Sequence, residues 1–252
     1  MSLTTLYRTV DIVSQWIKYR QPTMLQLHLL GKYTDVIDYD FTALRVASES
    51  AAKYRIEHML KAPNYKTDFD LREALVKEVH SQGSIFEFGV ASGRSINHLA
   101  RLFPNRQIQG FDSFEGLPET WTSYFKKGHF AQKVPKVRKN VTLHKGWFSD
   151  TLPNVTLATQ NVTCDNQIAL LHIDSDLYSS ASYVLTELKP YIDAGTVILF
   201  DEYINYPGWE QHEFKAWQEF VAKYHVVYEY IGVCSRHQQV AIKVKAIYND
   251  FD

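Results

Sequence analysis

The 252-residue sequence contains only two cysteines, Cys164 and Cys234. Two distant thiols do not build a disulfide framework, and their spacing is not that of a metal-binding cluster. Long apolar runs are also missing, because stretches such as Val197–Phe200 are far shorter than the roughly 20 residues of a membrane-spanning helix. We therefore expect a protein that keeps its thiols reduced and does not cross a membrane.

An excess of charge of one sign is absent too. Lys and Arg number 27 and Asp and Glu 28, which gives a net charge of −1. A dedicated duplex-DNA binder needs clustered basic residues and is disfavoured, although a charge count does not exclude a tRNA enzyme with a local basic patch. The first ten residues do not resemble a secretory signal, because Arg8 is their only basic residue and no apolar region follows. We predict a cytoplasmic protein with a small-molecule substrate, not a nucleic-acid or membrane partner.

The first 80 residues read differently from the rest of the chain. Their apolar spacing predicts helices over Val10–Tyr19, Phe41–Leu60 and Leu71–His80. Residues 61–70 read as a loop that ends in a capping segment at 67–70. We predict a helical appendage over residues 1–80, either packed on the main sheet or serving as a lid or an oligomer interface.

From residue 84 onward, short apolar strands alternate with helical patterns. This alternation predicts an α/β domain over residues 81–252 with a mostly parallel sheet, in which ligands bind at the carboxyl ends of the strands. The expected strands are Ile85–Gly89, Gln107–Phe111, Val141–His144, Ile168–Ile173, Thr196–Phe200, Val226–Ile231 and Val240–Val244. The expected helices are Arg94–Phe103, Ser180–Lys189 and Glu210–Tyr224.

The first strand runs into a turn with glycines at Gly89 and Gly93. Such a turn lets a ligand approach closely, and the helix that follows offers free N–H groups together with the hydroxyl of Ser95. Glu87, on the strand itself, is suited to accept a hydrogen bond from an ammonium group. The dinucleotide fingerprint has glycines at relative positions 0, 2 and 5, and counted from Gly89 the last two are absent, which disfavours NAD.

The next two strand ends carry groups suited to a nucleoside. Asp112 lies 25 residues after Glu87 and can accept the hydroxyls of a ribose, as acidic residues do at this place in related sheets. Gly146 precedes Trp147 and Phe148, and a glycine beside two aromatic rings suits a flat purine. The alternative for Asp112 is a helix cap, and the alternative for the two rings is core packing.

The fourth and fifth strand ends carry four carboxylates, on Asp174, Asp176, Asp201 and Glu202. If the two strands are neighbours, these groups repel one another by about 4 kcal/mol per pair at 4 Å with an effective dielectric near 20. Either a proton is retained or a divalent cation lies between them. All-oxygen ligands favour Mg²⁺, Mn²⁺ or Ca²⁺ over zinc. Some of these acids have the alternative role of capping helices.

Aromatic residues follow the fifth strand at Tyr203, Tyr206, Trp209 and Trp217. Their rings are suited to stack on a sugar or polyphenol substrate, and core packing is the alternative.

Taken together, five segments resemble the class I S-adenosylmethionine-dependent methyltransferases, with the closest likeness to the macrocin O-methyltransferase (TylF) family. That family methylates sugar hydroxyls of macrolides, and the resemblance covers roughly residues 80–205. It implies a Rossmann-like fold with a mostly parallel seven-stranded sheet, and a homo-oligomer, dimeric or larger. The segments are FEFGVASGRS at 86–95, FDSFEGLP at 111–118, GWFSDTLP at 146–153, HIDSDLYSS at 172–180 and LFDEY at 199–203.

The resemblance also implies roles for individual residues. S-adenosylmethionine would be held at its methionine end by Glu87, Gly89, Gly93 and Ser95. Its nucleoside would be held by Asp112, Ser113, Gly146, Trp147 and Phe148, with Asp174 also beside the cofactor. The metal positions of the family fall on Asp174, Asp201 and Glu202, and Asp174 and Asp201 are separated by the family's spacing of 27.

Two departures from related enzymes affect the mechanism. The macrolide enzymes have Asp-Asp where this chain has Asp201-Glu202, and the catechol O-methyltransferases, which share the metal-assisted mechanism, have a lysine base where this chain has Leu177. We therefore assign the catalytic role to Asp174 and Asp176, ahead of His144 and His172. A Mg²⁺ chelated by two adjacent hydroxyls would activate the acceptor.

The sequence supports a metal-assisted O-methyltransferase that acts on a vicinal diol, most plainly the sugar of a glycosylated natural product. A catechol-like or other small-molecule acceptor is the second hypothesis. A cofactor-binding scaffold that has lost catalysis is the third, and Glu202 keeps it open. Cofactor binding and metal-dependent turnover separate these hypotheses from one another and from a dehydrogenase.

Overall fold

The computed structural model describes residues 39–79, 82–159 and 168–248. The helix expected over Val10–Tyr19 and the thiol of Cys164 lie outside these residues. Over the described ranges, no helix combines the length and the apolar character needed to span a membrane. Cys234 is a buried free thiol, and burial raises its pKa to about 11.

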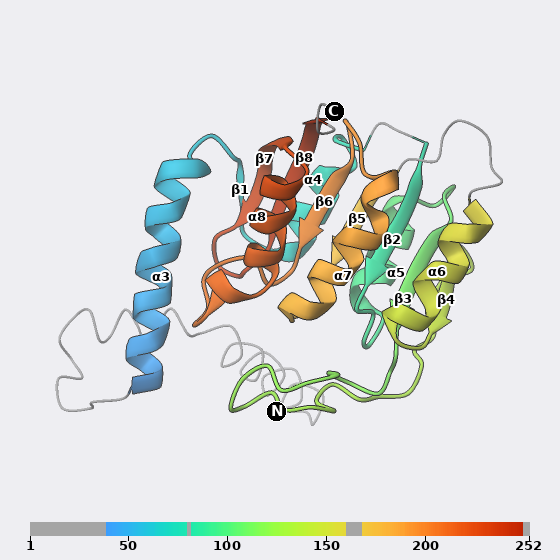
Figure 1. The fold of residues 1–252 in the computed structure, drawn as a ribbon, viewed down its shortest axis with the longest axis horizontal. Helices are drawn as coiled ribbons and strands as arrows, with labels where there is room; N and C mark the ends of the chain where they lie inside the picture. Colours follow the sequence, from blue (N-terminus) through green and yellow to red (C-terminus); the bar gives the residue numbers. More distant parts are fainter. Residues whose placement is uncertain (1–38, 80–81, 160–167, 249–252) are drawn as a thin grey trace, which may run out of the picture.

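Eight strands form one sheet in the order β1-β7-β8-β6-β5-β2-β3-β4 (Figure 1). β8 runs antiparallel to both of its neighbours, β6 and β7, and the other adjacent pairs are parallel. The predicted α/β fold with a mostly parallel sheet is confirmed. The strands are β1 Asn64–Tyr65, β2 Ser84–Phe88, β3 Ile108–Asp112, β4 Val141–Lys145, β5 Ile168–Ile173, β6 Val197–Phe200, β7 Val226–Cys234 and β8 Val240–Ile247.

The sheet has one strand more than the seven expected. β1 is a two-residue strand in the segment predicted as a loop, and Asn64 pairs there with Val233 of β7. Two residues are too few to show the alternation of side chains by which a strand is recognised, so the sequence pattern did not reveal β1.

Helices cover both faces of the sheet, and successive residues of a strand supply the two cores. In β5, Leu170 belongs to the core that includes Leu71 of α4 and Leu99 of α5, whereas Leu171 belongs to the core that includes Leu185 of α7. Burying each leucine side chain contributes roughly 1.5–3 kcal/mol. α6, α7 and α8 lie in front of the sheet in Figure 1 and α4 and α5 behind it. Their bounds are α4 Asp68–Leu75, α5 Arg94–Leu102, α6 Phe148–Thr159, α7 Tyr178–Leu188 and α8 Glu213–Lys223, with short 3-10 turns at Lys189–Tyr191 and Trp209–Gln211.

Two of these helices differ from the sequence prediction. α4 begins at Asp68 because Thr67 caps it, its side chain accepting a hydrogen bond from the N–H of Asp70 at 3.1 Å. α6 was not among the predicted helices, and it contains Pro153, a residue that ordinarily argues against a helix. α6 starts at Phe148, so the second predicted ring of the nucleoside site lies at a helix N-terminus.

The segment before residue 80 is tied to the sheet through β1 and α4, whose Leu71 and Leu75 are fully or almost fully buried. α3, over Tyr39–His58, lies beyond the edge of the sheet formed by β1 in Figure 1. It packs on the segment after β6, where the Ser48 hydroxyl donates to Asn205 and the Trp209 indole N–H donates to the Ser50 hydroxyl, both at 2.9 Å. A division of the chain at residue 80 into appendage and domain stays a prediction.

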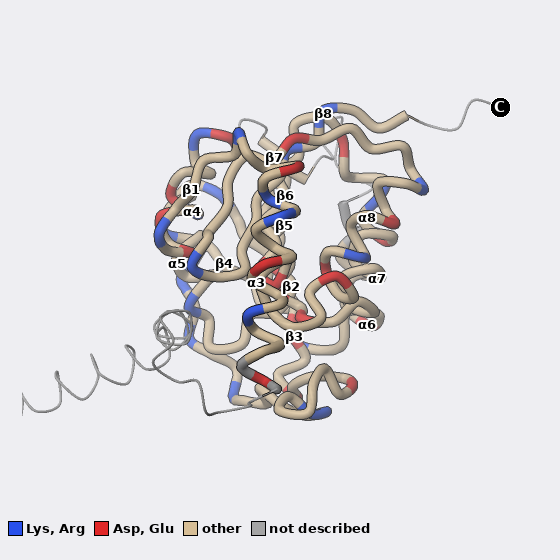
Figure 2. Tube along the Cα trace, turned by 90° about the vertical axis from the view of Figure 1, so that its left-hand side faces the viewer, with Lys and Arg blue, Asp and Glu red and all other residues tan. Residues whose placement is uncertain are grey.

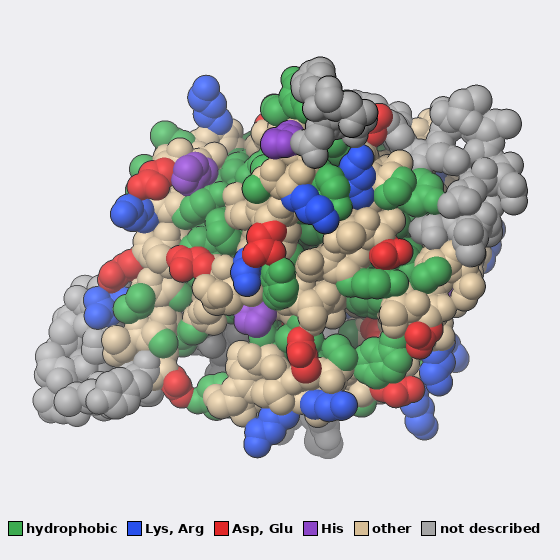
Figure 3. All heavy atoms as spheres, in the orientation of Figure 1, with side chains coloured by type: hydrophobic (Ala, Val, Ile, Leu, Met, Phe, Trp, Pro, Cys, Tyr) green, Lys and Arg blue, Asp and Glu red, His purple; other side chains and the backbone are tan. Residues whose placement is uncertain are grey.

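Charged residues of both signs are distributed over most of the elements in Figure 2. Figure 3 shows the same mixture at atomic detail on the face of α6, α7 and α8, where basic, acidic and hydrophobic side chains are interspersed. This distribution agrees with the near-zero net charge of the chain.

Candidate active site

A pocket of about 470 Å³ lies at the carboxyl ends of the parallel strands. Its wall is formed by the segments that follow β2, β3, β4, β5 and β6, as the predicted topology requires. Other predicted residues, Glu87, Gly93, Ser95, Gly146 and Asp201, do not line it. The predicted site residues that do line it are Gly89, Asp112, Ser113, Trp147, Phe148, Asp174, Asp176 and Glu202.

The glycine turn after β2 brings the first and fourth strand ends together. Gly89 has φ +90°, and a Cβ atom built on it would lie 1.6 Å from the backbone oxygen of Asp174. The Asp174 N–H also donates to the Phe88 carbonyl at 2.8 Å. Gly93, with φ +77°, precedes α5 in the left-handed conformation that glycine favours. Gly89 is thus required by the close approach of the Asp174 backbone.

Glu87 is fully buried beneath this turn and is already hydrogen-bonded. Its Oε1 accepts from the Ser95 hydroxyl at 2.9 Å, and its Oε2 lies 2.9 Å from Nδ1 of His172 on β5. On the other side of the ring, His172 Nε2 lies 3.6 Å from Oδ1 of Asp201. Glu87 therefore contacts protein groups at both oxygens, and its predicted contact with the cofactor stays a prediction.

Burial and two neighbouring carboxylates act on the pKa of His172 in opposite directions. Complete burial lowers its pKa, but the carboxylates of Asp201 and Glu87 more than offset this and raise the pKa to about 10. A buried acid that faces a protonated imidazole is stabilised in its charged form, and the pKa of Asp201 is correspondingly lowered by His172 in spite of burial. The pair also receives a hydrogen bond from the Gln239 amide to Asp201 at 3.0 Å.

Asp112 fastens the glycine turn to the end of β3. Its Oδ2 accepts from the N–H groups of Val90 and Ala91 at 2.9 and 2.7 Å, and its Oδ1 accepts from Phe114 N–H at 2.7 Å. A carboxylate has about four acceptor positions, so about one remains for a ligand. The resemblance assigns both ribose hydroxyls to this residue, and accepting both requires one backbone hydrogen bond to be released.

The segment after β4, the third predicted strand end, lies beside Asp112 and lines the same pocket. Gly146 has φ +145°, and its N–H donates to the Asp112 carbonyl at 3.0 Å. Trp147 and Phe148 are half-buried and line the pocket, and the ring of Phe148 meets that of Phe88 edge to face at 5.2 Å. Phe148 thus packs against the core on one flank while it also lines the pocket.

The four predicted carboxylates meet because β5 and β6 are neighbours. Ile173 pairs with Phe200 at the end of the two strands, and Asp201 N–H donates to the Ile173 carbonyl at 2.9 Å. Burial first, and neighbouring acids second, raise the pKa of Asp174 and of Glu202 well above the ordinary range. The same causes raise the pKa of Asp176 to about 7. The expected clustering of acids is confirmed.

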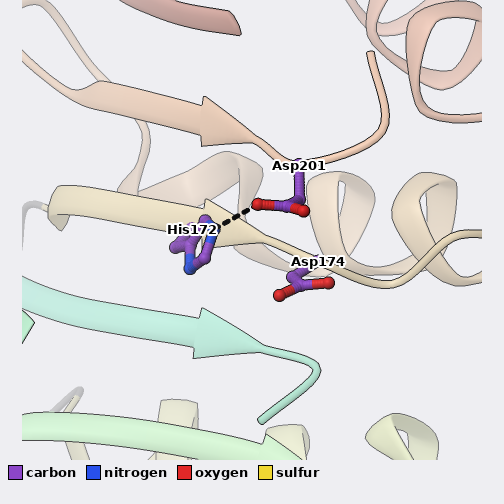
Figure 4. A group of neighbouring side chains, drawn as sticks. All are labelled: His172, Asp174 and Asp201. Atoms are coloured by element: carbon purple, nitrogen blue, oxygen red, sulfur yellow. Dashed lines mark ion pairs between the residues drawn. The ribbon is translucent and has the colours of Figure 1, made fainter. Parts of the chain in front are cut away.

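Within the described residues, one group of side chains can hold a metal ion. Ligand atoms of His172, Asp174 and Asp201 all lie within 4.8 Å of one another. Figure 4 shows the three side chains where two neighbouring strands end, with Asp174 and Asp201 just past the strands. The group combines one imidazole with two carboxylates, and a histidine must be neutral to bind a metal. Glu202, the third predicted ligand, lines the adjacent pocket, and its Oε2 is buried without a hydrogen-bond partner among the described residues.

The aromatic residues after β6 do not form a stacking surface in the pocket. Tyr203, Tyr206, Trp209 and Trp217 are all buried in the core under α8, and none of them lines the pocket. The prediction that they stack on substrate is wrong for this arrangement, because Trp217 of α8 and the three rings that precede α8 are all packed into the core. The ring of Phe130, in the long segment between β3 and β4, does line the pocket.

Several pocket residues were not singled out from the sequence. Ser175, Ser179, Ser180 and Tyr183 line the side of the pocket next to Asp176. The three serines lie within the segment 172–180, so the motif contained them, but hydroxyl residues at the start of a helix are ordinary capping candidates. The direction of α7 places Ser179, Ser180 and Tyr183 at the pocket, and the segment after β5 places Ser175 there.

Comparison with known proteins agrees with this geometry. Residues 86–203, just under half of the chain, match the family described as a methyltransferase domain. That range runs from the strand before the glycine turn to the residue after Glu202. It therefore includes the predicted site residues, and the expected class of domain is confirmed. The finer likeness to the macrocin O-methyltransferase family stays a prediction.

Two curated proteins are similar to this chain over about half of its length. The demethyldecarbamoylnovobiocin O-methyltransferase of Streptomyces niveus is 27% identical over 149 residues, 51% of this chain and 52% of that protein. The 8-demethyl-8-(2,3-dimethoxy-alpha-L-rhamnosyl)-tetracenomycin-C 4'-O-methyltransferase of Streptomyces olivaceus is 29% identical over 146 residues, 48% of this chain and 53% of that protein. The chain thus spans about half the length of these relatives.

The fold is also found in a solved structure. The calicheamicin methyltransferase CalS11 is similar with a TM-score of 0.56 and 24% identity, over 70% of this chain and 78% of that chain. This likeness extends the agreement from the sequence motifs to the arrangement of the sheet and its helices.

Proposed function

We propose that this protein is an S-adenosylmethionine-dependent O-methyltransferase that methylates a sugar hydroxyl next to a second hydroxyl, with help from a divalent cation. The observation that carries the proposal is one pocket with two kinds of wall. The glycine turn, Asp112 and Trp147 form one side, and Asp174, Asp176 and Glu202 form the other. A methyl donor and an acceptor can therefore meet within a single cavity.

The donor side suits S-adenosylmethionine better than a dinucleotide. The turn after β2 leaves the pocket open at Gly89, and the glycine spacing for a pyrophosphate is missing. Asp112 retains about one free acceptor position for the ribose, and Trp147 and Phe148 offer ring faces for the adenine. Glu87 and Ser95 would support the methionine end from beneath the turn.

The acid side suits a hard divalent cation. Asp174, Asp201 and Glu202 supply only oxygen, which favours Mg²⁺ or Mn²⁺. The buried Glu202 Oε2 has no hydrogen-bond partner in the part of the chain that the structure describes, and such an atom needs one. When bound, such an ion lowers the pKa of a substrate hydroxyl and orients it. Glu202 is one methylene longer than the aspartate of the macrolide enzymes, which lets its carboxylate reach further from the backbone.

The residues of the chain would contribute to methyl transfer by positioning the reactants and by accepting a proton. In an in-line displacement, the acceptor oxygen forms a bond to the methyl carbon while the carbon–sulfur bond of the sulfonium breaks. The hydroxyl proton passes to a carboxylate, and Asp176 is placed for this because it lines the pocket and its pKa is raised to about 7. Asp174 is the alternative base, since it also lines the pocket next to Gly89.

A sugar acceptor is favoured over a catechol by two considerations. The curated relatives are named for O-methylation of novobiocin and tetracenomycin precursors, and the second is named for its rhamnosyl group. Position 177 is the buried Leu177, so the lysine base of the catechol enzymes has no counterpart there. A cytoplasmic location and a homo-oligomer stay predictions beside this proposal.

Calorimetric titration with S-adenosylhomocysteine and with NAD tests the cofactor. S-adenosylhomocysteine should bind, Asp112→Ala should weaken it by at least about tenfold, and NAD should not bind. Ligand at 100 times its Kd should also stabilise the fold by about 2.7 kcal/mol. If neither ligand binds, the proposal fails and a scaffold that has lost catalysis becomes the better description.

Turnover then tests the acceptor and the ion. Purified protein with S-adenosylmethionine is assayed on glycosides with free vicinal hydroxyls and on catechols, with Mg²⁺ and with EDTA. Transfer to the glycosides that stops in EDTA supports the proposal. Transfer to catechols alone moves the assignment to the second hypothesis, and transfer that continues in EDTA removes the metal from the mechanism.

A further inference from the structure

Glu213 is a buried acid that no sequence motif or predicted site includes. It is the first residue of α8 and has 0% exposed surface. Its Oε1 accepts from the N–H of Ser175, and its Oε2 accepts from the N–H of Glu202, both at 3.1 Å. One carboxylate from a third element thus joins the two segments that carry the clustered acids.

These two contacts replace strand pairing where it ends. The ladder between β5 and β6 stops at Ile173 and Phe200, followed by one further hydrogen bond from Asp201 to Ile173. Ser175 then lies between Asp174 and Asp176, and Glu202 directly follows Asp201. Without Glu213, two buried N–H groups would be left unsatisfied, each at a cost of roughly 1–3 kcal/mol, and the segments would separate or turn toward other acceptors.

We propose that Glu213 is a positioning residue that fixes the spacing between the two acid-bearing strand ends and so sets the affinity of the site for a divalent cation. The inference rests on the metal-assisted function proposed above. Glu213 would not bind the cation itself, because its carboxyl group is occupied by the backbone N–H groups of Ser175 and Glu202. It would act on the ligands from outside, through the segments that carry them. Outer-shell groups of this kind commonly change metal affinity by about 10- to 100-fold when removed.

The chemistry of the contact requires a carboxylate of this length. A carboxylate accepts at both oxygens, whereas an amide accepts at one end and donates at the other. Glu213→Gln therefore keeps the shape but sets an NH₂ group against one of the two backbone N–H groups. Glu213→Asp keeps the carboxyl group but is one methylene shorter, which prevents it from reaching both N–H groups without moving α8.

The test measures Mn²⁺ binding to the cofactor-free protein by electron paramagnetic resonance, with S-adenosylhomocysteine binding measured in parallel. Glu213→Gln should weaken Mn²⁺ by about 10- to 100-fold and leave the S-adenosylhomocysteine Kd within about threefold. The amides of Ser175 and Glu202 should exchange faster with deuterium. The matched control is Glu219→Gln on the same helix, where the exposed carboxylate accepts from Tyr178 at 2.6 Å, and it should change none of these.

A second control separates positioning from general loss of stability. Leu188→Ala removes a fully buried side chain at the far end of α7 and should lower the melting temperature without changing the Mn²⁺ affinity. If Leu188→Ala weakens Mn²⁺ as much as Glu213→Gln, or if Glu213→Gln binds Mn²⁺ like the wild type, the proposal is overturned and the proposed function stands. If the wild type itself binds no Mn²⁺, the metal-assisted function fails and the role of Glu213 falls with it.

Discussion

Glu87 Oε2 and His172 Nδ1 lie 2.9 Å apart on adjacent parallel strands, and both side chains are completely buried. The two residues are direct partners in the register of β2 and β5. Glu87 also accepts from Ser95, at the start of α5, while the far side of the His172 ring faces Asp201. This pair therefore connects the donor side of the pocket with its acid side.

Removing the Glu87–His172 contact should lower the free energy of unfolding by an amount that depends on pH. His172→Ala leaves Glu87 buried without its imidazole partner and with only the Ser95 hydroxyl as donor, and we expect a loss of about 3–5 kcal/mol near pH 6. The folded pKa of His172, about 10, lies above the ordinary 6.5. Its stabilisation is therefore complete below pH 6.5 and is lost as the pH rises toward 10. Urea unfolding of wild type and variant across this range measures the difference.

Leu171→Ala provides the control for this prediction, because Leu171 is a fully buried neighbour without charge. Its cost should be similar in size and constant with pH. A wild-type minus His172→Ala difference that stays constant from pH 6 to 10 would contradict a protonated His172.

Substituting Gly89 by alanine should lower the free energy of unfolding by more than the ordinary cost of a positive φ, because the backbone of Asp174 lies so close. Gly89 and Gly208 have φ values of +90° and +84°, but an added Cβ at Gly208 meets nothing within 4 Å. Gly208→Ala should cost about 1–2 kcal/mol from backbone conformation alone. Gly89→Ala should cost at least about 4 kcal/mol because of the clash with the Asp174 carbonyl. Equal losses in chemical unfolding would show that the turn moves aside freely.

Asp176 should lower the stability of the fold at neutral pH and raise the rate of methyl transfer. Its folded pKa of about 7 lies above the ordinary 3.8, so its contribution to stability falls as the pH rises from about 4 to 7. Asp176→Asn removes that loss, and asparagine tolerates the backbone there, which has φ +61°. We expect a higher melting temperature at pH 7.5 and turnover reduced by roughly 10²- to 10⁴-fold, the range for removing a general base.

The measurements for Asp176→Asn are thermal melts between pH 4 and 8 and single-turnover methyl transfer at saturating S-adenosylmethionine. Glu187→Gln, which neutralises an exposed acid of α7 that does not line the pocket, is the control and should change neither the slope with pH nor the rate of transfer by more than about threefold. Wild-type rates in Asp176→Asn would assign the proton transfer to Asp174.

The acids nearest the metal position should affect turnover without affecting the cofactor. Asp174→Ala and Asp201→Ala should abolish methyl transfer while S-adenosylhomocysteine still binds in calorimetry, because the cofactor is held mainly by the opposite wall. Glu202→Asp should retain activity and Glu202→Ala should lose it. Loss of S-adenosylhomocysteine binding in both aspartate variants, with turnover indifferent to Mg²⁺, would contradict the metal role.

The sequence identified the strands that form the centre of the sheet, because their apolar runs lie between glycines and amphipathic helices. Ile168–Ile173 is found over the predicted residues. The sequence pattern did not reveal β1 or α6. A two-residue strand has no period, and Pro153 inside α6 is the residue that ordinarily argues against a helix.

The candidate site was predictable as a set of strand ends but not as a set of contacts. Parallel strands place their carboxyl ends at one edge of the sheet, so Gly89, Asp112 and Asp174 were expected to lie together, and they line one pocket. Sequence spacing could not show that Glu87 is occupied by His172 and Ser95, or that aromatic residues such as Trp209 turn into the core.

What the sequence alone determined is the chemistry available at the edge of the sheet, since residue types and their distance from a strand end are local properties. The tertiary structure decided which groups face one another. The pairing of β5 with β6 created the acid cluster, and the docking of α8 brought Glu213 onto Ser175 and Glu202. Glu213 lies 38 and 11 residues from these partners, and only the packing of α8 against α7 and the sheet closes those distances.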